Sequence, residues 1–151
     1  MSQGRPLSVL IVEDHAYLAR GFARALEREA YEVFLASDSE DGLLQADVHQ
    51  PDVVIADFRM PHGNGLDFMT RLRGRAGLER TGLVMVTGLP LDEDTQSDLR
   101  ALGAHLRSKP ISLEDFVAVV RDSVNERAGA APGDPARCVP ATEDNRRRTC
   151  A

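Results

Sequence analysis

The sequence predicts an α/β protein with a (βα)5 architecture: a five-stranded parallel sheet in the strand order 2-1-3-4-5, with helices on both faces. Two observations support this fold class. Short apolar runs alternate five times with segments of helical periodicity, as a mainly parallel sheet requires. The central run, residues 53–56, is mainly β-branched, which is typical of a strand buried on both faces, and it stops on a carboxylate, Asp57.

Length and composition indicate one globular domain with no nucleic-acid or membrane role. The chain has 151 residues and a formal net charge of −6, which argues against nucleic-acid binding. It has no apolar run of the ~20 residues that a membrane-spanning helix needs, and residues 1–10 lack the features of a secretory signal. Both cysteines, Cys138 and Cys150, are near the C-terminus, so the predicted domain has no disulfide framework. We therefore expect a cytoplasmic protein.

Five runs rich in apolar and β-branched residues predict the strands, because each is bounded by charged residues or turn formers. They cover residues 7–12, 31–36, 53–57, 82–87 and 104–108. A group of turn formers follows the third run and predicts an irregular loop directly after Asp57. These residues are Pro61, Gly63, Asn64 and Gly65.

The first two helices follow the first two strands. Residues 17–29 carry apolar side chains at helical spacing, with arginines on the other face. Ser37 or Ser39 can cap the second helix, and Glu40 lies three residues after Ser37, as in a capping box. The second helix is expected to end before residue 51, a proline. Its apolar residues are Leu43, Leu44 and Ala46.

The remaining helices differ in how much apolar surface they carry. The third has Leu66, Met69 and Leu72. The fourth, residues 92–102, is mostly polar and is ended by Gly103; we expect it and its neighbours to contact partners, because it is the least committed to the core. The last begins at residue 112 and has the clearest apolar stripe. The stripe consists of Leu113, Phe116, Val117, Val120 and Val124.

The flavodoxin-like form of the fold fits this chain best, because five β-α units account for residues 1–126. Residues 127–151 consist largely of Ala, Gly, Pro and Arg and almost lack large apolar side chains. We predict one domain over 1–126 and a disordered tail over 127–151, including the arginine run 146–148.

Five polar side chains converge at one edge of the predicted sheet, because all parallel strands end there. Glu13 and Asp14 follow the first strand, Asp57 ends the third, Thr87 ends the fourth and Lys109 follows the fifth. The first, third and fourth strands are adjacent in the predicted order, and the fifth lies beside the fourth. Lys109 is the only lysine in a chain with 18 basic residues. An ammonium is a more compact charge than a guanidinium, which suggests a specific role for it.

This group of side chains is suited to phosphoryl transfer. Clustered carboxylates repel one another unless a cation is present, and oxygen ligands of this kind suit Mg²⁺. A carboxylate beside the metal, here Asp57, can attack phosphorus and form an aspartyl-phosphate. The ammonium of Lys109 and the hydroxyl of Thr87 would meet the charge on the phosphoryl oxygens.

Residues 7–126 resemble the receiver domain of two-component response regulators, the CheY-like family. Five features in order carry the resemblance, each of them short and weak alone. They are the pair Glu13-Asp14 after an apolar strand, Asp57 at a strand end, the loop Met60-Pro61-His62-Gly63-Asn64-Gly65, Thr87 followed by Gly88, and Lys109-Pro110.

The resemblance implies a phosphorelay protein. Asp57 would accept phosphate from a phosphohistidine on a sensor histidine kinase. Asp14, Glu13 and Asp57, with the backbone carbonyl of Arg59, would hold Mg²⁺. Thr87 and Lys109 would then contact the phosphoryl group and alter the surface of the fourth helix, fifth strand and fifth helix. The peptide bond between Lys109 and residue 110 is often cis in this family.

We therefore expect a single-domain response regulator that is not an enzyme, although it assists its own phosphorylation and dephosphorylation. The tail is too short for a helix-turn-helix domain, so no DNA-binding domain is expected. The output would pass to an unknown downstream protein, or to a second copy through the face formed by the fourth helix, fifth strand and fifth helix.

Four positions depart from the pattern of the family or vary within it. Receivers usually have an aromatic residue three positions before the lysine, where this chain has Leu106 preceded by His105. Arg59 and Leu89 occupy positions that tune dephosphorylation in the family. Their side chains are long or bulky, so we predict that the phosphoryl group hydrolyses more slowly than with small residues there.

Two other readings remain open. A degenerate receiver would act only as a protein-interaction module, although all five site positions are present. An aspartyl-phosphate phosphatase of the haloacid dehalogenase type would have a second aspartate two residues after the first, where this chain has Arg59.

Overall fold

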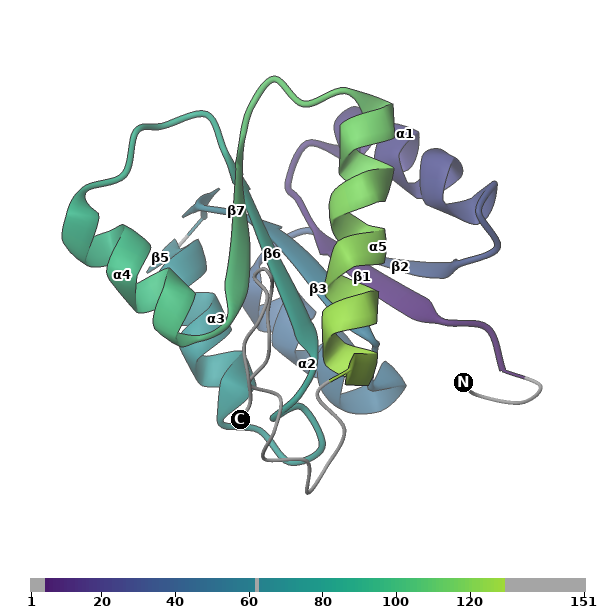
Figure 1. Cartoon of the computed structure of the whole chain (residues 1–151), viewed down its shortest axis with the longest axis horizontal. Helices are drawn as coiled ribbons and strands as arrows, with labels where there is room; N and C mark the ends of the chain where they lie inside the picture. The colour runs from purple at the N-terminus through teal and green to yellow at the C-terminus, as the bar shows by residue number, and fades with distance from the viewer. Residues whose placement is uncertain (1–4, 62, 130–151) are drawn as a thin grey trace.

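The computed structural model describes residues 5–61 and 63–129, and its centre is a five-stranded parallel sheet (Figure 1). The strands lie in the order β2-β1-β3-β6-β7. Two short strands, β4 and β5, interrupt the numbering, so this is the predicted order 2-1-3-4-5. The prediction of fold class is confirmed. The bounds are β1 Ser8–Val12, β2 Glu32–Ala36, β3 Val53–Asp57, β6 Gly82–Thr87 and β7 Ala104–Ser108.

Five helices cover the two faces of the sheet, as Figure 1 shows. Residues of α2, α3 and α4 pack in one apolar cluster, and residues of α1 and α5 pack in the other. The bounds are α1 Ala16–Glu27, α2 Ser39–His49, α3 Gly65–Arg73, α4 Glu93–Ala101 and α5 Leu113–Gly129.

Successive residues of the central strands face opposite clusters, as the pleat of a strand requires. Leu10 and Val54 contact the α2–α3–α4 side, whereas Val9 and Val53 contact the α1–α5 side. All four are buried. On the α1–α5 side the rings of Phe22 and Phe116 are stacked, with centroids 4.0 Å apart. Burial on both faces explains why these strands are apolar throughout.

Helix α4 contributes only one buried residue, Leu99, which agrees with its thin apolar face in the sequence. The helix ends at Ala101, and Gly103 has φ +81°, a left-handed conformation that glycine adopts readily. The chain can therefore turn directly into β7.

Several details of the prediction are wrong. The cap of α2 is Asp38, whose side chain accepts a hydrogen bond from the Asp41 N–H at 2.8 Å, so the Ser37–Glu40 capping box does not form. Leu44 and Leu113 were expected on apolar faces but are 64% and 46% exposed. A helix presents only part of its circumference to the core, and both side chains lie outside that part.

The loop after Asp57 is also more regular than expected, because it contains an antiparallel pair. Strands β4 Arg59–Met60 and β5 Gly63–Asn64 pair with Arg59 opposite Asn64. Turn formers are compatible with such a short pair, since two residues per strand suffice on either side of the turn. The last helix also continues beyond residue 126, to Gly129.

No helix within residues 5–61 and 63–129 is long and apolar enough to cross a membrane. His62 of the loop motif and the segment 130–151, which contains Cys138, Cys150 and the arginine run, lie outside the described residues.

Candidate functional site

Asp57 is the last residue of β3, and its carboxylate is held from both sides. Its Oδ1 accepts a hydrogen bond from the Arg59 N–H at 3.1 Å, which fixes the turn that follows the strand. The chain then returns toward β3, because the Gly65 N–H donates to the Phe58 carbonyl at 2.7 Å. A Cβ at Gly65 would lie 2.8 Å from the Asp57 carbonyl oxygen, so only glycine fits this close approach.

Lys109 brings the only ammonium to Asp57. Its Nζ donates to Asp57 Oδ2 at 2.5 Å and lies 3.5 Å from Glu13 Oε1. The backbone of Lys109 is fixed as well, because its N–H donates to the Thr87 carbonyl at 2.8 Å. The bond between Lys109 and Pro110 is cis, as the resemblance implied. One ammonium therefore joins two carboxylates that come from different strands.

The acidic pair lies directly after β1. Glu13 is nearly buried, and its Oε2 accepts a hydrogen bond from the His15 N–H at 3.2 Å. Asp14 is exposed. Burial raises the pKa of Glu13 above its ordinary value, the nearby Lys109 opposes this rise, and the charges of Asp57 and Asp14 add to it. The three carboxylates therefore act on one another electrostatically.

The pKa of Lys109 reflects the same group of charges. Burial alone would lower this pKa, but the hydrogen bond to Asp57 and the charges of Glu13 and Asp57 outweigh that effect. The net result is a pKa above the ordinary value of lysine. The side chain is thus held in its charged form.

Thr87 ends β6, which pairs with β3 on one side and with β7 on the other. Its hydroxyl is buried and accepts a hydrogen bond from the Leu89 N–H at 3.1 Å. This contact uses a lone pair of the oxygen, so the hydroxyl proton can still be donated to another group. Thr87 lies beside Asp57 because Asp57 is opposite Val86 in the ladder.

The structure thus places the ammonium of Lys109 against both Asp57 and Glu13, with Asp14 and Thr87 nearby. Within the described residues, no three His, Cys, Asp or Glu side chains form a group that could hold a metal ion as they stand. Mg²⁺ commonly uses only one or two carboxylates and completes its shell with water. Burial raises the pKa of Glu13 and the charges of Asp57 and Asp14 add to this rise, so the three acidic side chains lie close enough to interact. Their oxygen donors fit Mg²⁺ chemically.

The position of the missing aromatic residue is filled by Leu106. Its side chain is partly buried and packs on the α2–α3–α4 cluster. His105 points to the other side, where its Nε2 lies 3.0 Å from Glu126 Oε1 on α5. His105 therefore does not take the place of the aromatic residue, since neighbouring residues of a strand face opposite sides.

Arg59 and Leu89 both lie near the carboxylate. Arg59 follows Asp57 closely enough for its N–H to bind that side chain, and Leu89 is tied to Thr87. Both side chains are exposed. The sequence indicated Gly65 only as a turn former and gave no sign of the His15 N–H as a donor. The close approach of Gly65 depends on Asp57 of β3 and Met85 of β6, which no local pattern around Gly65 shows.

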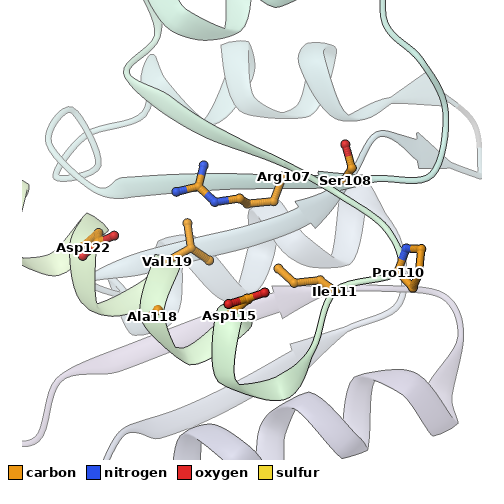
Figure 2. Close-up of a pocket in the computed structure, with 8 residues that line it drawn as sticks. All are labelled: Arg107, Ser108, Pro110, Ile111, Asp115, Ala118, Val119 and Asp122. Atoms are coloured by element: carbon orange, nitrogen blue, oxygen red, sulfur yellow. The ribbon is translucent and has the colours of Figure 1, made fainter.

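A separate surface pocket of about 280 Å³ lies between β7 and α5 (Figure 2). Apolar and polar side chains both line it, and three of the lining side chains are charged: Arg107 from β7 and Asp115 and Asp122 from α5. Among the described residues none of these three has an ion-pair partner within 4.0 Å. The pocket belongs to the face on which partner contacts were expected.

The (βα)5 sheet and the side chains around Asp57 together define a class of signalling domain. The family model for the response regulator receiver domain matches residues 9–121, and the chain belongs to this family. It is thus a receiver domain of a two-component response regulator.

Curated relatives are longer than this chain. It is 33% identical over 122 residues to the probable transcriptional regulatory protein TcrX of Mycobacterium tuberculosis, which covers 80% of this chain and 50% of that protein. It is 29% identical over 128 residues to the KDP operon transcriptional regulatory protein KdpE of Escherichia coli, covering 85% of this chain and 56% of that protein. The chain therefore spans about half the length of these relatives.

Solved structures of similar fold include the chemotaxis response regulator CheY4 of Vibrio cholerae, with 25% identity, a TM-score of 0.71 and coverage of 79% of this chain and 99% of that chain. A CheY-like receiver domain protein of Methanospirillum hungatei has 20% identity and a TM-score of 0.77, with coverage of 84% and 100%. The latter likeness concerns the fold alone.

Proposed function

We propose that this receiver domain accepts a phosphoryl group on Asp57 from a sensor histidine kinase and signals through protein contacts. The observation that carries the proposal is the position of Lys109, whose ammonium contacts both Asp57 and Glu13. A strand-end carboxylate with an acidic neighbour and a fixed ammonium is suited to receive a phosphoryl group.

In the proposed reaction, a carboxylate oxygen of Asp57 forms a bond to phosphorus while the bond from phosphorus to the imidazole nitrogen of the donor breaks. The imidazole, which carries a proton on its other ring nitrogen, leaves with that electron pair as a neutral ring. Lys109 moves from the carboxylate to the phosphoryl oxygens, where its charge is needed. Thr87 donates its hydroxyl proton to another of these oxygens, since its hydrogen bond from Leu89 leaves that proton available.

Glu13, Asp14 and Asp57, with the backbone carbonyl of Arg59, would hold Mg²⁺ in this proposal. When bound, the ion supplies positive charge that offsets the repulsion between the incoming phosphate and the carboxylates. The placement of these oxygen donors supports this assignment, because Glu13 and Asp14 directly follow β1 and the charges of Asp57 and Asp14 act on Glu13.

The phosphodonor has to approach the edge of the sheet where Asp57 lies. Three large apolar side chains are exposed around that edge, on α1, after β6 and at the beginning of α5. They are Tyr17, Leu89 and Leu113. Apolar side chains ringed by polar ones are typical of interaction sites, which accounts for the exposure of Leu113.

The output is proposed to pass through the face formed by α4, β7 and α5, either to a downstream protein or to a second copy. Arg107 and the two aspartates of the β7–α5 pocket support a self-complementary contact, since both signs of charge line it. A structure described as the beryllofluoride-activated NtrC4 receiver domain dimer, with 23% identity and a TM-score of 0.72, resembles this fold. A cytoplasmic location stays a prediction.

Labelling with acetyl phosphate and Mg²⁺ tests the function. Wild type should incorporate one phosphoryl group per chain, and Asp57→Asn should incorporate none. Asp98→Asn, which changes an exposed carboxylate on α4, is the matched control and should label as wild type does. Equal labelling of Asp57→Asn and wild type would exclude Asp57, and repeated turnover of small phosphate esters would instead indicate a phosphatase.

The lifetime of the phosphoryl group tests the roles of Arg59 and Leu89. Arg59→Ala and Leu89→Ala should each shorten the half-life severalfold, because water reaches the phosphorus more easily past a small side chain. The measurement is loss of label after removal of the donor. A half-life that neither substitution changes would contradict the prediction.

A further inference from the structure

One guanidinium joins three segments at the edge of the sheet opposite Asp57. Arg73, in the last turn of α3, donates through Nη1 to the carbonyl oxygens of Leu78, Glu79 and Thr81 at 3.3, 3.1 and 2.6 Å. Its Nη2 donates to the carbonyl of Leu102 at 2.6 Å. The planar fork of an arginine, with five donors, can make such a set of bonds, whereas the ammonium of lysine lacks this geometry.

The environment of Arg73 distinguishes it from a surface arginine. Burial lowers the pKa of Arg73 below its ordinary value. In the part of the chain that the structure describes, no carboxylate lies within 4.0 Å of it, so backbone carbonyls satisfy its donors. Arg75, two residues later, makes an ordinary exposed ion pair with Asp47 instead.

The carbonyls that Arg73 binds lie where two strands of the site begin. Leu78, Glu79 and Thr81 precede β6, which ends in Thr87, and Leu102 caps α4 immediately before β7, which leads to Lys109. Arg73 therefore holds together the beginnings of the two strands that carry these residues.

Helix α4 is attached differently at its two ends. Near its C-terminal end it contributes its one buried residue, Leu99, and its cap residue is bound by Arg73. At its other end, residues 88–92 connect it to Thr87, and Figure 1 shows this connection as a long loop beyond the end of β6. A change at Thr87 thus reaches α4 through the end that Arg73 does not hold.

We propose that Arg73 is a positioning residue: it fixes the C-terminal end of α4 and the beginnings of β6 and β7 as one block, about which α4 turns when Asp57 is phosphorylated. The turning rests on the proposed function, whereas the fixed block does not. In this arrangement the movement is greatest near residue 93, and β7 keeps its register with β6.

Amide hydrogen exchange of the full chain, with and without beryllofluoride and Mg²⁺ as a phosphoryl mimic, tests the proposal. In wild type, the mimic should change exchange severalfold in residues 88–97 but by less than about twofold at the amides of Thr81, Leu102 and Gly103. In Arg73→Met, these three amides should exchange roughly tenfold faster without the mimic, because their segments lose charge-assisted hydrogen bonds. With the mimic, the change should extend through residue 105.

Arg75→Met is the matched control and should leave the three amides unchanged, because Arg75 has only an exposed partner. Arg73→Lys keeps the charge without the planar fork; it should shift the same three amides and still be labelled on Asp57 as wild type is. If Arg73→Met destabilises the whole chain, the exchange rates of all amides rise together. In that case the exchange of the three amides in Arg73→Lys, compared with wild type, tests the proposal.

Two results would overturn the proposal: unchanged exchange at the three amides in Arg73→Lys and Arg73→Met, or a mimic effect in wild type that is equal along the whole of α4. The two proposals can fail separately. If acetyl phosphate does not label wild type but the three amides still respond to Arg73→Lys, phosphorylation at Asp57 is overturned and the fixed block is supported.

Discussion

Gly65 shows how a single residue limits the geometry around Asp57. It is the first residue of α3, and a Cβ there would lie 2.5 Å from Met85 Cε as well as 2.8 Å from the Asp57 carbonyl oxygen. The backbone oxygen cannot move without disturbing β3. The close approach is therefore a matter of space and involves no unusual backbone conformation.

Gly65→Ala should lower the free energy of unfolding by about 1–3 kcal/mol, the usual cost of overpacking. Gly21→Ala is the matched control: Gly21 is inside α1 and a Cβ there meets nothing within 4 Å. This substitution should raise the free energy by about 0.5–1 kcal/mol, because alanine favours the helix. Urea unfolding measures both, and a stable Gly65→Ala would contradict the predicted close approach.

Glu13 should make stability depend on pH. Burial raises the pKa of Glu13 above its ordinary value of 4.5, so the folded state binds the proton more tightly than the unfolded state. The contribution of Glu13 to stability is then fully present below pH 4.5 and is lost as the pH rises through the raised pKa.

Relative to wild type, Glu13→Gln should therefore become more stable as the pH rises above 4.5 in the absence of divalent cations. Urea unfolding of both proteins over this range measures the difference. A difference that is independent of pH would show that the carboxyl has its ordinary pKa. Added Mg²⁺ should stabilise wild type more than the variant, if Glu13 takes part in holding the ion.

At the scale of the elements, the capping residue of α2 lies between the two serines that were predicted to cap the helix. Ser37, Asp38 and Ser39 are all residues that favour caps, and Asp38 has the extended conformation and the side-chain hydrogen bond of a cap. The bond of Ser37 to Asp41 uses its backbone N–H and not its hydroxyl.

Asp38→Ala should lower the free energy of unfolding by ~1 kcal/mol, since the N–H of Asp41 loses its acceptor. Ser37→Ala should change the free energy by less than about 0.5 kcal/mol, because its side chain has no part in the cap. Thermal or urea unfolding can be used. Equal losses of unfolding free energy in the two variants would contradict the assignment of Asp38 as the cap and would support the predicted capping box.

At the scale of the whole molecule, the mixed charges of the β7–α5 pocket allow two copies to meet about a two-fold axis, with Arg107 of each facing the aspartates of the other. Sedimentation equilibrium of the phosphorylated protein should show a dimer that Arg107→Asp weakens roughly tenfold or more by like-charge repulsion. Adding Asp122→Arg should restore it.

Arg121→Gln is the control for this contact, because Arg121 pairs with Glu29 of its own chain. It should leave the dimer intact. If the phosphorylated protein stays monomeric at all concentrations, the dimer is excluded, and the partner of this face would be a downstream protein.

The sequence predicted the fold class well, because the fold class depends on local patterns, whereas the functional roles of the site residues stay predictions. Apolar runs defined every strand of the main sheet. The strand order was predicted by choosing the flavodoxin-like arrangement for a domain of five β-α units, and this order led us to expect Lys109 near Asp57, where the structure has it. Leu106 was assigned to the position of the missing aromatic residue from the pattern of the family, and its packing on the α2–α3–α4 cluster is what the structure adds.

Other features depend on contacts between distant residues and left no local signal. The side chain of Arg73 donates to four backbone carbonyls, and one of them, that of Leu102, lies 29 residues away in the sequence. The exposure of Leu44 depends on the rotation of α2 about its axis, which a short stripe does not define. The β4–β5 pair is too short for any periodicity.

The thin apolar face of α4 has a consequence for evolution. Since Leu99 is the only buried residue among the nine of the helix, the other eight positions can change with little effect on the core. Surface substitutions away from caps and special contacts usually change stability by no more than ~0.5 kcal/mol. The residues on this surface can therefore change quickly in evolution, while the residues around Asp57 stay the same. Such changes would give paralogous proteins different partners.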